Sequence, residues 1–221
     1  MLKSIPIIFL IGLFLVSCNA VKIIDQPITF DEERKQLSLE YMSERYGIEK
    51  STPTINPKMI VVHWTAISDF DQSFNAFRNS RLPDSRADIT NASALNVSAQ
   101  FLIDQDGTVY RLLPETTMAR HVIGLNHCAI GIENVGGTPD KPLTKEQLKS
   151  NIKLIKYLKE QFPEISYVIG HYEYTLFEGH PLWLEKDEKY RTEKKDPGED
   201  FMHSIRKSTA SLNWQTIPVK L

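Results

Sequence analysis

A continuous apolar run, Met59-Ile60-Val61-Val62, constrains the fold of this chain more than any other feature of its sequence. Such a run is typical of a strand that is buried on both faces, whereas a strand with one face in solvent alternates apolar and polar residues. Tyr167-Val168-Ile169 is a second, shorter run of the same kind. Strands of this type need helices on both faces of their sheet, so the two runs predict an α/β fold.

The rest of the chain supplies helices and further strands around these two runs. Asp106-Gly107 favours a tight hairpin turn between two apolar stretches. Strands are expected at 98–103, 108–112 and 129–135, and helices at 29–46, 69–78, 144–162 and from Asp196 onward. Residues 79–96 form a long polar loop, whose length suggests a function or a lid. The whole pattern predicts a mixed central β-sheet flanked by helices.

Two of the expected helices begin with a capping box, in which a hydroxyl side chain and an acidic or amide side chain satisfy backbone N–H groups of the first turn. Thr29 with Glu32 and Thr144 with Gln147 have the required spacing. The apolar residues of the second helix repeat on one side. The residues expected on its buried face are Leu148, Ile152, Ile155 and Leu158.

The composition is that of one globular domain with a substantial core: 221 residues, of which 41% are hydrophobic and 24% charged. The formal net charge is −2, and no basic stripe is present. Nucleic-acid binding proteins carry such a stripe, so we expect no nucleic-acid partner. We expect the chain to be a monomer.

The N-terminus has the pattern of a secretory signal. An apolar run from Ile5 to Val16 is too short for a membrane span, which needs roughly 20 residues. It ends at Leu15-Val16-Ser17-Cys18, which resembles a bacterial lipobox; the alternative is an uncleaved anchor or a buried helix. The expected parts are a signal peptide at 1–18, a tether at 19–28 and one domain at 29–221. Cys18 would carry the lipid and anchor the protein to a membrane facing the periplasm, and Asn19 favours the outer membrane.

The sequence contains two cysteines, Cys18 and Cys128. A lipid on Cys18 would leave no intramolecular disulfide. Cys128 follows His127, and a Cys–His pair can form a nucleophile. However, neighbouring residues of a strand point to opposite faces, so we interpret Cys128 as a packing residue.

Two histidines share a position in the predicted sheet: His63 follows the first apolar run, and His171 follows the second after Gly170. Ligands gather at the carboxyl ends of strands in open α/β sheets, so these side chains could converge; the alternative is a pair of core or rim histidines. Asp196 would complete the two-histidine, one-carboxylate set of a hydrolytic zinc site. His180 is a rival ligand. Asp196 is also a candidate cap for a helix that starts at Pro197.

Glu133 is a candidate general acid or base. The strand period places Ala129, Gly131 and Glu133 on one face, where two small residues leave room for a ligand beside the carboxylate. Such a carboxylate could exchange protons with a water molecule at a neighbouring metal. The alternative is a strand carboxylate in solvent.

The ordered motifs resemble a known family, the zinc-dependent N-acetylmuramoyl-L-alanine amidases of the type 2 class, which share their fold with peptidoglycan recognition proteins. The resemblance covers about Met59 to Phe201. Five motifs carry it: Val61-Val62-His63-Trp64-Thr65, Ser98-Ala99-Gln100-Phe101-Leu102-Ile103-Asp104 with Asp106-Gly107-Thr108, His121-Val122-Ile123-Gly124-Leu125-Asn126, Ala129-Ile130-Gly131-Ile132-Glu133, and Ile169-Gly170-His171 followed by Lys194-Lys195-Asp196-Pro197-Gly198.

The resemblance implies a role for each matching residue. His63, His171 and Asp196 would bind one zinc ion. Glu133 would handle the proton of the attacking water, and Lys194 would stabilise the oxyanion, with Lys195 pointing away. The residues expected to contact substrate are His121, Asn126, Trp64 and Trp183.

Two departures from the family pattern concern the substrate groove. Gln100 stands where many relatives have histidine, and the segment between His171 and Asp196 is longer than usual. This segment, 172–195, is either a groove wall, where Trp183 and Tyr190 stack on sugar, or a solvated excursion. The resemblance implies hydrolysis of the amide between N-acetylmuramic acid and L-alanine in peptidoglycan or muropeptides. The alternative is a peptidoglycan-binding lipoprotein of the same fold that has no activity.

Overall fold

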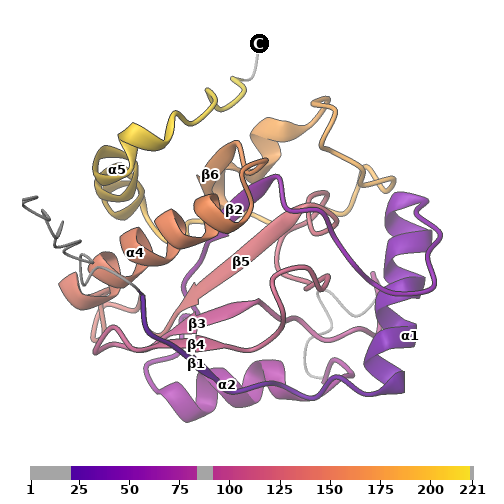
Figure 1. The fold of residues 1–221 in the computed structure, drawn as a ribbon. Coiled ribbons are helices and arrows are strands. Elements are labelled where there is room, and N and C mark those ends of the chain that lie inside the picture. The colour runs from indigo at the N-terminus through magenta and orange to yellow at the C-terminus, as the bar shows by residue number, and fades with distance from the viewer. Residues whose placement is uncertain (1–20, 84–91, 220–221) are drawn as a thin grey trace, which may run out of the picture.

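The computed structural model describes residues 21–83 and 92–219. Its sheet has six strands in the order β1-β4-β3-β5-β2-β6 (Figure 1). The strands are β1 (Ile23–Asp25), β2 (Met59–Val62), β3 (Phe101–Ile103), β4 (Val109–Arg111), β5 (Ala129–Asn134) and β6 (Tyr167–Gly170). The helices are α1 (Glu32–Tyr41), α2 (Phe70–Arg78), α4 (Lys145–Gln161) and α5 (Glu199–Ser208), with a π-helix, η1 (Met42–Tyr46), and two 3-10 helices, η2 (His171–Phe177) and η3 (Ala210–Leu212).

The sheet is mixed. β2 lies between β5 and β6 and is parallel to both, and β3 is parallel to β5. The hairpin strands β3 and β4 are antiparallel, joined by the Asp-Gly turn. The prediction of a mixed central sheet flanked by helices is therefore confirmed.

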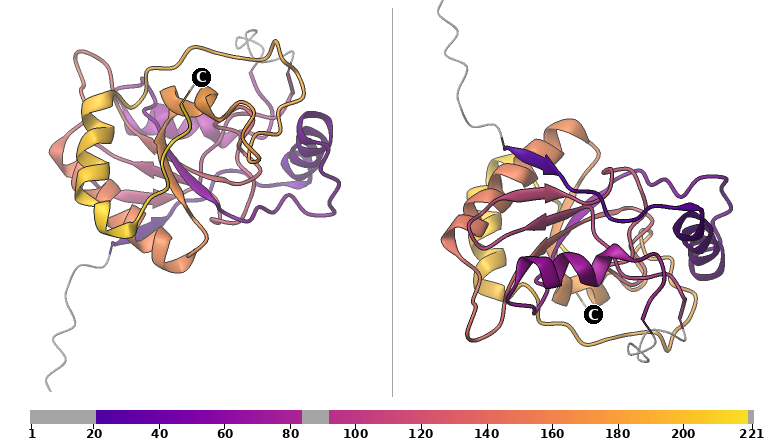
Figure 2. Two further views of the ribbon diagram at one scale, coloured as in Figure 1. Left: turned by 90° about the horizontal axis from the view of Figure 1, so that it is seen from above. Right: turned by 90° about the horizontal axis from the view of Figure 1, so that it is seen from below.

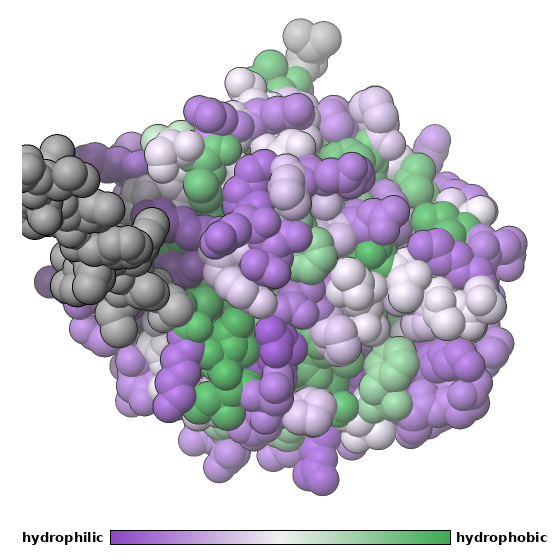
Figure 3. Space-filling model, viewed as in Figure 1, coloured by the Kyte–Doolittle hydropathy of each residue, from purple (hydrophilic) through white to green (hydrophobic). Residues whose placement is uncertain are grey.

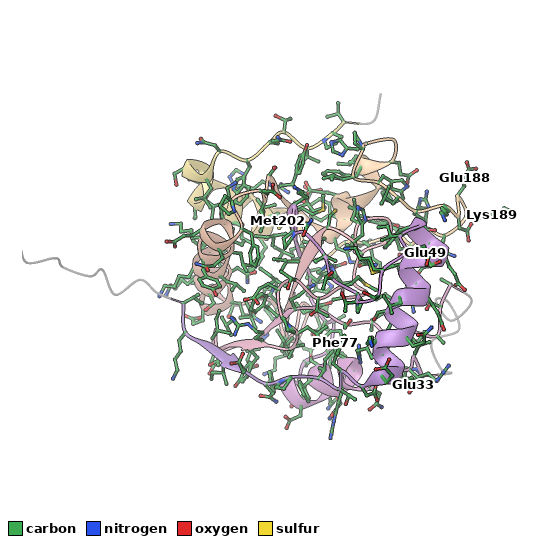
Figure 4. The ribbon with its side chains drawn as sticks, turned by 45° about the vertical axis from the view of Figure 1, so that its right-hand side comes forward. Glu33, Glu49, Phe77, Glu188, Lys189 and Met202 are labelled. Atoms are coloured by element: carbon green, nitrogen blue, oxygen red, sulfur yellow. The ribbon has the colours of Figure 1, made fainter. Side chains whose placement is uncertain are left out.

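Alternate residues of the central strands enter two different hydrophobic clusters. Ile60 and Val62 of β2 pack with residues of α4 and α5, whereas Met59 and Val61 pack on the opposite face. α2 covers that opposite face near β3, where Phe77 packs on Leu102. Burial on both faces is what the continuous apolar runs predict. Phe77 and Met202, from the helices on the two faces, both lie within the body of the molecule (Figure 4).

α1 and η1 lie at one end of the molecule, and α4 and α5 lie at the other, in every view of the ribbon (Figure 1 and Figure 2). The buried apolar residues of α1 and η1 form a separate cluster with Ile55, Leu95 and Met118 rather than with the sheet. The surface in Figure 3 is mainly hydrophilic, and its hydrophobic patches are interrupted by polar side chains. None of the helices in the described ranges has the length and hydropathy to cross a membrane.

Part of the segment expected to be a tether, 19–28, belongs to the sheet. Ile23–Asp25 pair in parallel with β4, and Ile28 is buried against β3 and α2. The segment has no strong apolar run because β1 is an edge strand with mostly exposed side chains. Residues 1–20, including Cys18, lie outside the described residues.

The helix starts differ from the predictions in two of three places. α1 is capped by Asp31, whose carboxylate accepts from the Arg34 N–H, and not by Thr29. Asp196 does not cap α5; the N-cap is Gly198, with φ of 92°, and the helix begins at Glu199. In both cases the observed cap lies two residues after the predicted one. The capping box of Thr144 and Gln147 is confirmed.

α4 buries a face that is rotated from the predicted one. Ile155 and Leu158 are buried as expected, but Leu154 is buried in place of Ile152, which is half-buried. The rotation brings two polar residues of α4 against the sheet. The Gln147 amide donates to the Ile103 and Val135 carbonyls, and Asn151 donates to the Asn134 side chain at 2.7 Å. An apolar periodicity does not reveal such polar anchors.

Cys128 is a buried packing residue, as predicted. Its thiol donates to the Leu125 carbonyl at 3.4 Å, and burial raises the pKa of the thiol to about 12. A thiol with so high a pKa is not a nucleophile at neutral pH.

The Asn134 side chain links α4 to the strand that ends in His63. Besides accepting from Asn151, it donates to the His63 carbonyl at 2.9 Å, and it is fully buried. We expect Asn134→Ala to lower the free energy of unfolding by about 2–4 kcal/mol, because two buried partners lose their hydrogen bond. Chemical denaturation measures this value. Asn75→Ala, at an exposed position of α2, is the control and should change stability by less than about 0.5 kcal/mol.

Candidate active site

Three polar side chains stand at the same level of the sheet because of strand register. Val62 of β2 pairs with Ile132 of β5 and with Gly170 of β6. The residues that follow these three are His63, Glu133 and His171, respectively. All three are buried, so the carboxyl ends of three parallel strands bring them to one place.

The His63 and His171 rings meet the Asp196 carboxylate there. Nδ1 of His63 lies 2.9 Å from Nδ1 of His171 and 3.2 Å from Oδ2 of Asp196, and the third separation is 3.0 Å. A tetrahedral zinc ion, with bonds of about 2.0–2.2 Å, holds its donors roughly 3.3 Å apart. Two imidazole nitrogens and one carboxylate oxygen at these separations fit such an ion.

The protonation states of this group suit metal binding. Burial, with the neighbouring His63, lowers the pKa of His171 to about 4. Burial alone would raise the pKa of Asp196, but the His171 and His63 rings beside its carboxylate hold that pKa far below the usual value. Neutral imidazole and ionised carboxylate are the forms that bind metals.

Backbone contacts hold the Asp196 segment against the strand end. The Tyr172 N–H donates to the Asp196 carbonyl at 3.1 Å. Glu173, two residues after His171, accepts from the Gly170 N–H and pairs with Arg206 of α5. This partly buried pair links the turn that carries His171 to the helix that follows Asp196. Local sequence patterns do not reveal this pair, because Glu173 and Arg206 are far apart in the chain.

Glu133 is 9% exposed, and its Oε2 has no hydrogen-bond partner among the described residues. Burial raises the pKa of Glu133 to about 7; His63 and Lys194 oppose the rise, and Asp196 adds to it. A carboxyl group with this pKa can accept and return a proton near neutral pH.

A cavity of about 260 Å³ connects these groups. Its lining includes Glu133, His171 and Asp196, together with Trp64 and Lys194. Lys194 also lines a smaller neighbouring cavity of about 70 Å³. It therefore lies beside the donors, whereas Lys195 is exposed, as expected for its neighbour.

Trp64 is placed to form a wall for a ligand. It also lines an open groove of about 690 Å³ together with Pro197 and Phe201. Gly137 lies against its ring, and a Cβ there would come 2.3 Å from the indole. The structure thus puts Trp64 at the junction of the donor cavity and the groove.

Asn126 and Trp183, which the sequence predicts to contact substrate, are held by contacts within the protein. The Asn126 side chain is fully buried; it accepts from the His121 and Val122 N–H groups and donates to Tyr46. It is therefore a residue of turn structure, because its hydrogen-bonding groups are already used.

Three groups lie against the Trp183 ring. The ring stacks on Tyr174 at 6.1 Å, and the Arg191 guanidinium lies 4.6 Å over it. The ring also covers Gly124, where a Cβ would come 2.6 Å from it. The ring is half-buried among these contacts. Tyr190, the other aromatic residue expected to stack, does line the smaller cavity.

The long segment 172–195 packs on the protein along part of its length. Glu185 is buried and pairs with Arg45 of η1 at 3.0 Å, and the Arg45 guanidinium also lies 4.6 Å over Tyr190. Glu188 and Lys189 are exposed at the outer edge (Figure 4). The segment is thus a wall beside the smaller cavity with a solvated rim.

The remaining histidines lie elsewhere, apart from His121. Nε2 of His180 lies 3.3 Å from the Tyr167 hydroxyl, with which it shares a hydrogen bond, and His180 does not join the donor group. His203 is exposed on α5. His121 lies 3.0 Å from His63, on the side of the His63 ring away from the donors.

Gln100 keeps a structural role at its buried position. Its side-chain oxygen accepts from the Gly131 N–H at 2.7 Å, and its amide donates to the Thr117 carbonyl at 2.8 Å. Gln100 thus fixes the strand beneath the cavity, and its side chain is fully buried.

Solved structures with the same fold include a bacterial amidase and an insect PGRP. An N-acetylmuramoyl-L-alanine amidase, LysC from Clostridium intestinale, superposes with a TM-score of 0.54 at 22% identity, covering 88% of this chain and 99% of that one. Bumblebee PGRP-SA superposes with a TM-score of 0.50 at 21% identity, covering 89% and 99%. At these identities the likeness concerns the fold. Among curated protein sequences, no significant match was found.

The family comparison covers the part of the chain that builds the site. The model of the family described as N-acetylmuramoyl-L-alanine amidase matches residues 53–199. The match includes all three donor residues, Glu133 and Lys194, and more than half of the chain. This chain is a member of the N-acetylmuramoyl-L-alanine amidase family.

Proposed function

We propose that this protein is a zinc-dependent amidase that cleaves the bond between N-acetylmuramic acid and L-alanine in peptidoglycan or muropeptides. The observation that carries the proposal is the buried group of His63, His171 and Asp196 in one cavity with Glu133. Membership of the amidase family supports the same substrate class.

Each residue of the cavity has a task in amide hydrolysis. When bound by the three donors, zinc supplies Lewis-acid polarisation and acidifies water. Glu133 accepts the proton of the attacking water, which its pKa of about 7 permits, and returns it to the leaving amine. Lys194 offers a positive charge to the oxygen of the scissile amide as that oxygen becomes negative. Trp64 supplies an apolar wall for the substrate.

The rival function, peptidoglycan binding without hydrolysis, does not explain the composition of the cavity. A binding protein has no use for a buried carboxyl group with an unpaired oxygen beside three metal donors. An unpaired buried carboxylate destabilises the fold, so its presence favours catalysis.

We further propose that the protein is a lipoprotein of the cell envelope, held by a lipid on Cys18 and facing the periplasm from the outer membrane. The support is the sequence Leu15-Val16-Ser17-Cys18 after an apolar run. Such a location would place the cavity within reach of peptidoglycan.

Asp196→Ala is expected to remove zinc and activity together, because the two histidines alone leave the ion with one protein ligand too few. Metal analysis of the purified protein should show that the zinc content falls from about one ion per chain to well below one. Release of stem peptide from muropeptides should be lost in the same samples. Lys195→Ala, at the exposed neighbour, is the control and should keep both. Full activity with zinc bound in the Asp196 variant would refute the ligand assignment.

Glu133→Gln is expected to keep zinc and lose turnover by roughly 10²–10⁴-fold, because it removes proton transfer and leaves the donors in place. Loss of zinc instead would mean that Glu133 is a ligand.

The same variant tests the raised pKa of Glu133. The folded value of about 7 lies above the unperturbed value of 4.5, so the wild-type chain loses stability as pH rises from about 4.5 to 7. Glutamine does not ionise. Without metal, the variant should match the wild type at pH 4 and exceed its unfolding free energy at pH 8 by up to about 3 kcal/mol.

Cys18→Ser is expected to release the protein from the membrane fraction of the producing bacterium into the soluble fraction, because serine carries no thioether lipid. Cell fractionation with immunodetection measures this. Membrane retention equal to that of the wild type would mean that another segment anchors the chain.

A further inference from the structure

His121 forms a hydrogen-bonded link between His63 and the backbone of β5. Its Nδ1 lies 3.0 Å from Nε2 of His63, and its Nε2 lies 3.3 Å from the Ala129 carbonyl oxygen. The two rings meet edge to face, with centroids 5.0 Å apart and an interplanar angle of 88°. The link therefore touches His63 on the nitrogen that does not face Asp196.

The link determines which nitrogen of each ring carries hydrogen. A carbonyl oxygen only accepts, so Nε2 of His121 must donate to Ala129. In the neutral ring, Nδ1 of His121 is then an acceptor, and Nε2 of His63 must donate to it. Nδ1 of His63 is left with a free lone pair, and this is the atom that faces His171 and Asp196.

The His121 ring can take its position because Gly131 has no side chain. The ring lies on Gly131 of β5, where a Cβ would come 2.8 Å from its Cγ. The Gly131 N–H is held by Gln100, and the His121 N–H is held by Asn126. The absence of a Cβ at Gly131 thus leaves the space in which the His121 ring contacts both His63 and the Ala129 carbonyl.

We propose that His121 is a positioning residue that fixes the tautomer of His63, so that Nδ1 of His63 is permanently available as a metal donor. This inference deepens the proposed function and rests on it in one respect, the identity of the bound ion as zinc. It adds a role to the expected contact of His121 with the sugar or the stem peptide, because His121 also lines both cavities. Without the link, His63 would divide its population between two tautomers and more than one ring orientation.

A pair of substitutions tests the role of the acceptor. His121→Phe keeps a ring but removes the acceptor, whereas His121→Asn offers an oxygen near the former Nδ1. Competition with a chromophoric chelator measures the zinc affinity of each purified protein. Affinity should fall by about 10–100-fold in the Phe variant, the range for partners of metal-bound histidines, and should be largely restored in the Asn variant.

Gly131→Ala is an independent variant that displaces the His121 ring without changing its chemistry. It should also weaken zinc binding, although the ligands themselves are intact. Thr138→Ala, at a groove position away from His121, is a control for substitution near the site and should leave the affinity unchanged. If the Phe variant binds zinc as tightly as the wild type and only KM rises, His121 contacts substrate and the proposal is wrong.

A spectroscopic measurement separates this proposal from the proposed function. Nitrogen-15 NMR of the metal-free protein reports which nitrogen of His63 is protonated. The wild type should show the Nε2–H form, and the Phe variant a mixture. Absence of zinc binding in the wild type would refute the zinc amidase, whereas a mixture of tautomers in the wild type would refute the role of His121.

Discussion

The parallel pairing of β2 with β5 and β6 is the constraint on which the candidate site depends. Because Val62 pairs with both Ile132 and Gly170, the residues that follow in the three strands emerge together. A register shift of one residue in any strand would send its side chain to the opposite face. The apolar faces of these strands are buried in two clusters, so the hydrophobic core that fixes the register also fixes the chemistry.

The site holds buried charge by giving most of its polar atoms a partner. Asp196 contacts two imidazoles, and the backbone of His63 is bound by Asn134, which α4 holds in turn. Glu133 is the exception, with one oxygen left without a partner in the described structure. The contrast divides the cavity into a rigid side that suits ligand binding and one carboxyl group that is free to exchange a proton.

Much of the fold and of the donor group could be predicted from the sequence, because buried parallel strands leave long apolar runs and the histidines directly follow them. The contacts of Asn126 and Trp183 could not be predicted, because they join segments that are far apart in the sequence: Tyr46 with Asn126, and Gly124 with Trp183. Edge strand β1 was missed because an exposed strand needs no apolar run.

The Arg45–Glu185 pair makes the N-terminal helical region part of the catalytic architecture. Glu185 belongs to the segment that ends in Lys194 and Asp196, and Arg45 belongs to η1, which precedes the family-matched residues 53–199. A fragment cut to those residues would keep every donor but would lose the Arg45 partner of the buried Glu185. The contacts that hold this segment thus extend beyond the region that defines the family.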